Sequence, residues 1–247
     1  TAISDTSADG SDACPPDGCP PTSSAIRLNA TNIVSAVANP MSDGGVLISG
    51  VFERCLVVGV DGSCPDVTGN SLHRIQTAGG LDTWDGFVLR LKPDGTVDWL
   101  RRVQSSAKFG AHALMLTDNA PLADGRFMLG GLYNNSEVPT YHQDDVQAPG
   151  AVPSSPEHQA YLAQVETGHE TLGWSYGFGH EQDDVINWVD ASGNSVVAAG
   201  AFGKHPQPLP QDSLSEEVQV GGSDQNGILY VLSDRGEQDQ LHSFLDN

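Results

Sequence analysis

A strand–turn–strand pattern that recurs three times along the chain is the feature that most constrains its fold. Each copy joins two stretches of apolar and β-branched residues through a polar turn, and it closes on a glycine followed by an aromatic residue. The copies span residues 31–52, 111–133 and 183–202, and they close on Gly50 and Phe52, Gly131 and Tyr133, and Gly200 and Phe202. A supersecondary unit that recurs at a long period predicts a repeat architecture, because one unit cannot bury its apolar face alone.

A second strand–turn–strand pattern alternates with the first. Its copies span residues 84–103, 159–178 and 226–245, with a glycine in each turn (Gly95, Gly168, Gly236) and an aromatic residue in each second strand (Trp99, Trp174, Phe244). Turn residues roughly every 8–12 positions are typical of short antiparallel strands, and no segment has a clear helical period. Two hairpins per repeat give the strand content of one β-propeller blade.

The repeats predict an all-β, antiparallel, β-propeller-like array over residues 26–247. Its three four-stranded blades would span residues 26–104, 105–178 and 179–247. A propeller typically needs about four or more blades to close. Three blades would therefore form an incomplete propeller, which the rest of a longer chain or neighbouring copies would complete.

The stretch from residue 174 to residue 203 contains an ordered set of residues: Trp174, Gly179, Asp184, Asp190, Gly193, Asn194 and Gly200. This order resembles the bacterial SBBP repeat of seven-bladed β-propellers, and residues 85–88 with residues 94–95 resemble another strand of that repeat. The resemblance implies propeller blades over most of residues 27–247. The second copy departs from it, with residues 108–110 in place of the paired aspartates, and the third lacks the tryptophan of the second hairpin.

Residues 1–25 are rich in Ser, Thr, Asp, Pro and Gly and have almost no large apolar side chains. They bury too little apolar surface to offset the entropy of ordering, so we expect a disordered linker. The chain begins at Thr1 without a basic and apolar leader, which fits a processed chain or an excised domain.

The net charge of the chain is −21, from 32 acidic and 11 basic residues. This charge disfavours nucleic acid and anionic membrane surfaces as partners. The sequence has no apolar run of about 20 residues, so it predicts no integral membrane segment.

The four cysteines form two close pairs, Cys14 with Cys19 and Cys55 with Cys64. Closing a short loop costs little entropy, so the spacing predicts two local disulfides, the first within the linker. Disulfides indicate an oxidising, extracytoplasmic location, either secreted or at the cell surface. A zinc site is the alternative, but no Cys-x-x-Cys pair or paired histidine accompanies these cysteines.

Two acidic pairs, Asp144 with Asp145 and Asp183 with Asp184, each follow a histidine by a few residues. Converging carboxylate and carbonyl oxygens are the ligands that Ca²⁺ prefers, so these four residues are the candidate metal ligands. The alternative is that they are solvated or bond their own turns. Neither pair has the spacing of a dedicated calcium loop.

Trp84 lies between Asp82 and Asp85 in a glycine- and aspartate-rich setting, which makes these three residues the candidate contacts for a glycan. The two aspartates have the alternative role of capping turns. Trp99 and Trp174 occupy equivalent repeat positions with apolar neighbours, so we expect them to pack between blades. Trp188 would also contact a sugar if it were exposed.

The sequence contains no Gly-x-Ser-x-Gly elbow, His-Glu-x-x-His pair or phosphate-binding loop. We therefore expect a non-enzymatic structural or binding module that self-assembles or recognises another surface protein. A calcium-dependent glycan-binding adhesin is the first alternative. A propeller enzyme that cleaves polysaccharide with two carboxylates is the second.

Overall fold

The computed structural model describes residues 28–59, 73–77, 84–104, 114–135, 140–141, 155–168, 171–178, 184–202, 226–233, 235–236 and 238–244. These residues form β-strands and turns only, and all the strand pairs are antiparallel. The predicted all-β, antiparallel class is therefore confirmed. The linker predicted at residues 1–25 lies outside the described residues.

The first sheet, sheet A, has four main strands in chain order: β1 (Leu28–Pro40), β2 (Val46–Val58), β4 (Trp84–Leu91) and β5 (Val97–Gln104). Two short strands extend it. The first, β3 (Arg74–Gln76), pairs with the end of β2. The second, β8 (Thr140–Tyr141), comes from the second repeat and pairs with β5, so it crosses to the sheet of the first repeat.

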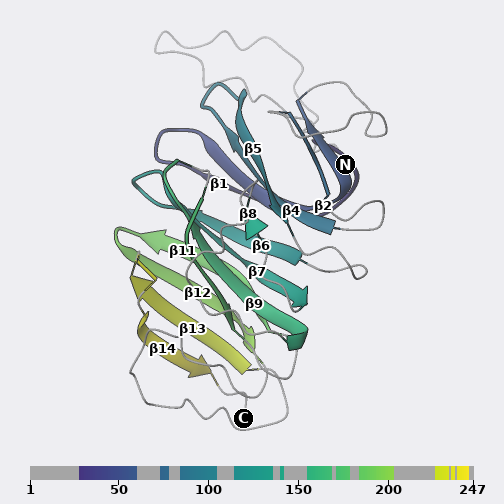
Figure 1. Ribbon diagram of the computed structural model, residues 1–247. Helices are drawn as coiled ribbons and strands as arrows, with labels where there is room; N and C mark the ends of the chain where they lie inside the picture. Colours follow the sequence, from purple (N-terminus) through teal and green to yellow (C-terminus); the bar gives the residue numbers. More distant parts are fainter. Residues whose placement is uncertain are drawn as a thin grey trace, which may run out of the picture.

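Sheets B and C have the same meander order as the main strands of sheet A. Sheet B contains β6 (Leu114–Pro121), β7 (Phe127–Asn135), β9 (Ser155–Val165) and β10 (Leu172–Phe178). Sheet C contains β11 (Val185–Ser192), β12 (Ser195–Phe202), β13 (Asn226–Ser233) and β14 (Gln238–Phe244). Figure 1 shows the three sheets in succession, with sheet A at the top, sheet B in the middle and sheet C at the bottom.

Three hairpin turns use the same Asp-Gly pair in the same geometry. In each, the aspartate carboxylate accepts a hydrogen bond from the backbone N–H two residues later, at 3.0, 2.9 and 3.1 Å, and the glycine has a positive φ. Aspartate favours this bond to its own turn, and glycine adopts positive φ without steric cost. The pairs are Asp43–Gly44, Asp94–Gly95 and Asp124–Gly125.

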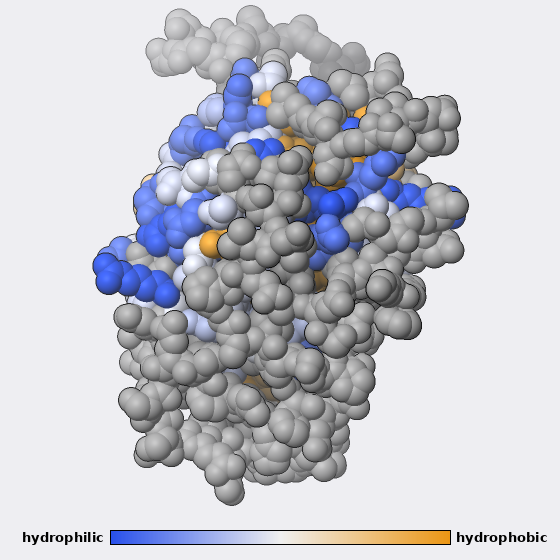
Figure 2. Space-filling view, in the orientation of Figure 1, coloured by the Kyte–Doolittle hydropathy of each residue, from blue (hydrophilic) through white to orange (hydrophobic). Residues whose placement is uncertain are grey.

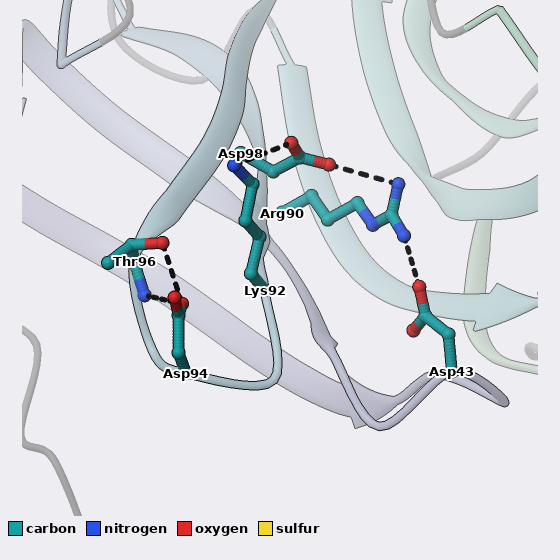
Figure 3. A network of polar contacts seen from close by, with 6 residues as sticks. All are labelled: Asp43, Arg90, Lys92, Asp94, Thr96 and Asp98. Atoms are coloured by element: carbon teal, nitrogen blue, oxygen red, sulfur yellow. Dashed lines mark hydrogen bonds and ion pairs between the residues drawn. The ribbon is translucent and has the colours of Figure 1, made fainter.

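Charged side chains join the two turns of sheet A (Figure 3). Arg90 on β4 forms ion pairs with Asp43 in the β1–β2 turn and with Asp98 on β5, the latter at 3.0 Å. The N–H of Gly45, together with the Arg90 guanidinium, lowers the pKa of Asp43 below its ordinary value. Figure 2 shows mainly hydrophilic residues on the left of the same view, where Figure 1 places the hairpin turns of sheets A and B.

Two apolar clusters hold the three sheets together. The A–B cluster contains Trp99 of sheet A and Phe127 of sheet B, whose rings stack with centroids 5.8 Å apart. The B–C cluster contains Trp174 of sheet B, whose ring also lies against Gly236 in the β13–β14 turn of sheet C. The prediction that Trp99 and Trp174 pack between repeats is therefore confirmed. The described part of the chain has no helix with the length and apolar character needed to cross a bilayer.

All five tyrosines of the chain are buried, and burial raises the pKa of Tyr133, Tyr161 and Tyr230 above the ordinary value. Because the folded pKa is the higher one, the stability from these phenols is complete below the unfolded-state pKa of about 10 and falls as the pH rises above it. We expect phenolate absorbance to appear only together with the loss of β-structure in an alkaline titration followed by ultraviolet absorbance and circular dichroism. Tyrosine ionisation with the β-signal intact would contradict this burial.

Candidate functional site

The first strands of the three sheets, β1, β6 and β11, lie next to one another. Side-chain hydroxyls connect them to the neighbouring backbone. Ser35 on β1 donates a hydrogen bond to the carbonyl oxygen of Leu116 on β6, at 3.0 Å. Thr117 on β6 donates to the carbonyl oxygen of Ile186 on β11. Sheet A is thus bonded to sheet B, and sheet B to sheet C, along one line of strands.

Asp118 connects sheets B and C through its carboxylate. A β-bulge between Leu116 and Asp118 interrupts the ladder with β7 just before this residue. The side chain is buried, and its two oxygens accept hydrogen bonds from the N–H groups of Asn119, at 2.8 Å, and Val189, at 2.9 Å. A carboxylate with both oxygens bonded to backbone N–H groups is a structural clamp between strands.

Two asparagines make the corresponding connection between sheets A and B. The side-chain nitrogen of Asn39, at the end of β1, donates a hydrogen bond to the carbonyl oxygen of Asn119 on β6, at 2.6 Å. The side-chain nitrogen of Asn119 donates in turn to the hydroxyl of Ser49 on β2, at 2.9 Å. Residues about 80 positions apart in the chain therefore share one polar network.

A cavity of about 520 Å³ opens where these three strands end. Its lining combines amides, two carboxylates, an indole and small apolar groups, and the lining residues are Asn39, Pro40, Asp118, Asn119, Ala120, Pro121, Trp188, Val189, Asp190 and Ala191. None of them is basic. Trp188 is 46% exposed, and among the described residues it is the one large apolar side chain that is exposed.

The predicted metal ligands are only partly within the described residues. Asp184 is buried directly before β11, and its charge contributes to the raised pKa of Tyr230, after the effect of burial itself. Asp144, Asp145 and Asp183 lie outside the described residues. Within the described ranges, no three His, Cys, Asp or Glu side chains form a group that could hold a metal ion. The calcium site stays a prediction.

Two of the three predicted glycan contacts, Trp84 and Asp85, lie in sheet A. Asp85 is fully buried and lies 3.8 Å from the Nε of Arg102, with which it forms an ion pair. Trp84 is half-buried and packs against the A–B cluster. Asp82 lies outside the described residues. The tryptophan that the structure exposes is Trp188, because its side chain lies opposite Ala199 on the face of sheet C that no other described strand covers.

Of the four cysteines, only Cys55 is among the described residues. It is buried on β2, and its sulfur is not a free thiol. The pairings Cys14–Cys19 and Cys55–Cys64 stay predictions, because their other members lie outside the described part of the chain.

The outer face of sheet C is apolar over β12 and β13, and no other described strand packs on it. It carries Val197 and Ala199 of β12 opposite Val231 and Leu229 of β13, all of them half-buried. On β11 the same face carries Trp188 and Asp190, which pair with Ala199 and Val197. The strand positions that correspond to Val197, counted back from the repeated glycines, are Leu47 in sheet A and Met128 in sheet B. Both are fully buried, Leu47 in the A–B cluster and Met128 in the B–C cluster.

No protein-family model matches the sequence, and no curated protein matches it.

Proposed function

We propose that this chain is a non-catalytic, extracytoplasmic structural and binding module with β-propeller-like blades, and that it acts by associating with a second copy of itself. The apolar outer face of sheet C carries this proposal. Three meanders of the same order packed face to face support a propeller-like arrangement, in keeping with the resemblance to the SBBP repeat.

The faces of sheets A and B that correspond to the outer face of sheet C are already used within the chain. Sheet A buries Leu47 and Val51 against sheet B, and sheet B buries Met128 against sheet C. The outer face of sheet C thus offers a neighbour the same kind of surface. Burying it would remove apolar area from water, which is the main driving force of association. A second copy is the occupant that we favour, because its sheets already pack on faces of this kind.

The charge of the chain gives this association a recognisable salt dependence. Two copies with a net charge of −21 each repel one another at long range. Salt screens this repulsion and leaves the apolar contact in place. Association should therefore strengthen as the salt concentration rises, whereas an interface held by ion pairs would weaken.

We expect the mass in solution, measured by light scattering or sedimentation, to rise with protein concentration and with salt. Leu229→Asp should raise the dissociation constant at least about tenfold, because it places a charge in the centre of the contact. Ala123→Asp, which adds the same charge at an exposed turn of sheet B, is the matched control and should leave the mass unchanged. Circular dichroism of both variants checks that they fold.

A strict monomer at every concentration and salt level would overturn the proposal. So would an unchanged dissociation constant in a folded Leu229→Asp variant.

The cavity at the ends of β1, β6 and β11 favours binding over catalysis. Glycoside hydrolysis needs two available carboxyl groups, one as acid and one as base or nucleophile. Of the two aspartates that line the cavity, Asp118 has both oxygens bonded to backbone N–H groups. Only Asp190 keeps an oxygen outside such a bond, since its other oxygen accepts from the N–H of Ala191, at 2.8 Å.

A further inference from the structure

We infer that the cavity at the ends of β1, β6 and β11 binds an uncharged saccharide, with the indole of Trp188 stacked against a sugar ring. This site adjoins the association face, because Trp188 and Asp190 pair across the strands with Ala199 and Val197 of that face. Of the sugar contacts that the sequence offers, it includes only Trp188. Its parts come from all three sheets, so it forms only when the three repeats pack together.

Trp188 has the position and the exposure of a stacking platform. In sheet C it directly follows a β-bulge, as Asp118 does in sheet B. Asp118 uses this position to bond the next sheet, whereas Trp188 leaves nearly half of its surface open beside the cavity. The other tryptophans of the chain are buried or half-buried in the apolar clusters. An exposed indole face beside a cavity is suited to the apolar C–H face of a sugar.

The polar groups around the indole suit hydroxyl groups of a ligand. Asn39 uses its side-chain nitrogen on Asn119, which leaves the amide oxygen as an acceptor. On β11, the second carboxylate oxygen of Asp190 is another acceptor. Each sugar hydroxyl can donate to such an oxygen and accept in turn. Pro40, Pro121 and Ala191 complete the lining with small apolar surfaces.

The charge of the cavity decides between classes of ligand. The lining has two carboxylates and no basic residue, on a chain of net charge −21, so an acidic polysaccharide would be repelled. An alkylammonium or basic peptide would be drawn to the carboxylates, but sites for such cations enclose the charge with several aromatic faces. Among the described residues of the lining, Trp188 is the single aromatic one. A volume of about 520 Å³ lies in the range of small-molecule sites. A neutral sugar fits these features best.

The test uses the whole chain and a panel of neutral tetrasaccharides built from glucose, mannose, galactose or N-acetylglucosamine. Tryptophan fluorescence and titration calorimetry should show saturable binding of at least one of them. Trp188→Ala should weaken that binding at least about tenfold, Trp188→Phe should weaken it less, and Asp190→Asn should weaken it severalfold. Asn187→Ala, an exposed neighbour on β11 outside the cavity lining, should leave it unchanged.

The result is distinguishable from that of the association test. Leu229 lies two strands away from Trp188 and is not one of the cavity-lining residues, so Leu229→Asp should bind the saccharide as the unmodified chain does. Sugar binding can therefore succeed where self-association fails, and the reverse. The inference would be overturned if none of the tetrasaccharides bound saturably. Binding that survives Trp188→Ala would do the same, as would a cavity that takes up a lysine-rich peptide or an acidic oligosaccharide instead.

Discussion

Gly131→Ala is expected to lower the free energy of unfolding by about 2–4 kcal/mol, although it adds a single methyl group. Gly131 pairs with Leu116 on β6, beside the β-bulge. A Cβ atom at this position would collide with the carbonyl oxygen of Met115 and would lie 3.0 Å from the carbonyl carbon of that residue. Both are backbone atoms, which cannot rotate away as a side chain can, so β6 would have to move from β7.

Gly168→Ala is the matched control for this prediction. No heavy atom lies within 4 Å of a Cβ built at Gly168, and its φ is not positive. Its alanine variant should therefore unfold within about 0.5 kcal/mol of the unmodified chain. Urea denaturation followed by circular dichroism measures both variants, and equal midpoints would show that β6 and β7 do not approach as closely as described. Alanine at Gly50 or Gly200, whose Cβ atoms would meet the carbonyl oxygens of Ser35 and Val185, should match Gly131→Ala.

These glycines illustrate how far the sequence alone leads. Their recurrence before an aromatic residue identifies the repeat, and local chemistry predicts the turns, because an Asp-Gly pair suits one geometry wherever it occurs. The polar turn expected within the copy at residues 183–202 lies between β11 and β12, with a positive φ at Gly193. The reason for the glycine at position 131 is not local. It depends on a strand that starts 17 residues earlier, at Leu114, and on how closely the two backbones approach.

The candidate site could not be predicted from the sequence for a similar reason. Asn39 directly precedes Pro40, and Asn119 precedes Pro121 with one residue between them; both asparagines lie near the end of the first strand of a repeat. Asp190 lies near the end of the first strand of the third repeat. This recurrence is the signal that could have singled them out. Their convergence depends on the packing of the three sheets, which no spacing within one repeat encodes. The same holds for exposure. Trp84 has the more polar neighbours in sequence but packs against the A–B cluster, whereas Trp188 has Val189 beside it and is exposed.

Asp118→Ala is expected to cost about 2–4 kcal/mol of stability, because it removes the acceptor of two backbone N–H groups from a buried position. One of these groups, the N–H of Val189, belongs to sheet C, so the loss should loosen the contact between sheets B and C first. Asp190→Ala is the control from the same cavity. Its carboxylate is exposed and, among the described residues, bonds the adjacent N–H of Ala191 alone, so its loss should cost less than about 1 kcal/mol.

Amide hydrogen exchange separates a clamp between sheets from a general loss of stability. If the Asp118 carboxylate joins β6 to β11, its removal should speed exchange at Val189 and along β11 more than in sheet A, which Asp118 reaches only through the contact of its carboxylate with the Asn39 side chain at 3.5 Å. Asp118→Asn keeps one oxygen acceptor and should fall between the aspartate and the alanine. Uniform acceleration over all three sheets would contradict the clamp. A β11 that exchanges faster while sheet A stays protected would show that the cavity depends on this carboxylate, since one wall of the cavity is β11 itself.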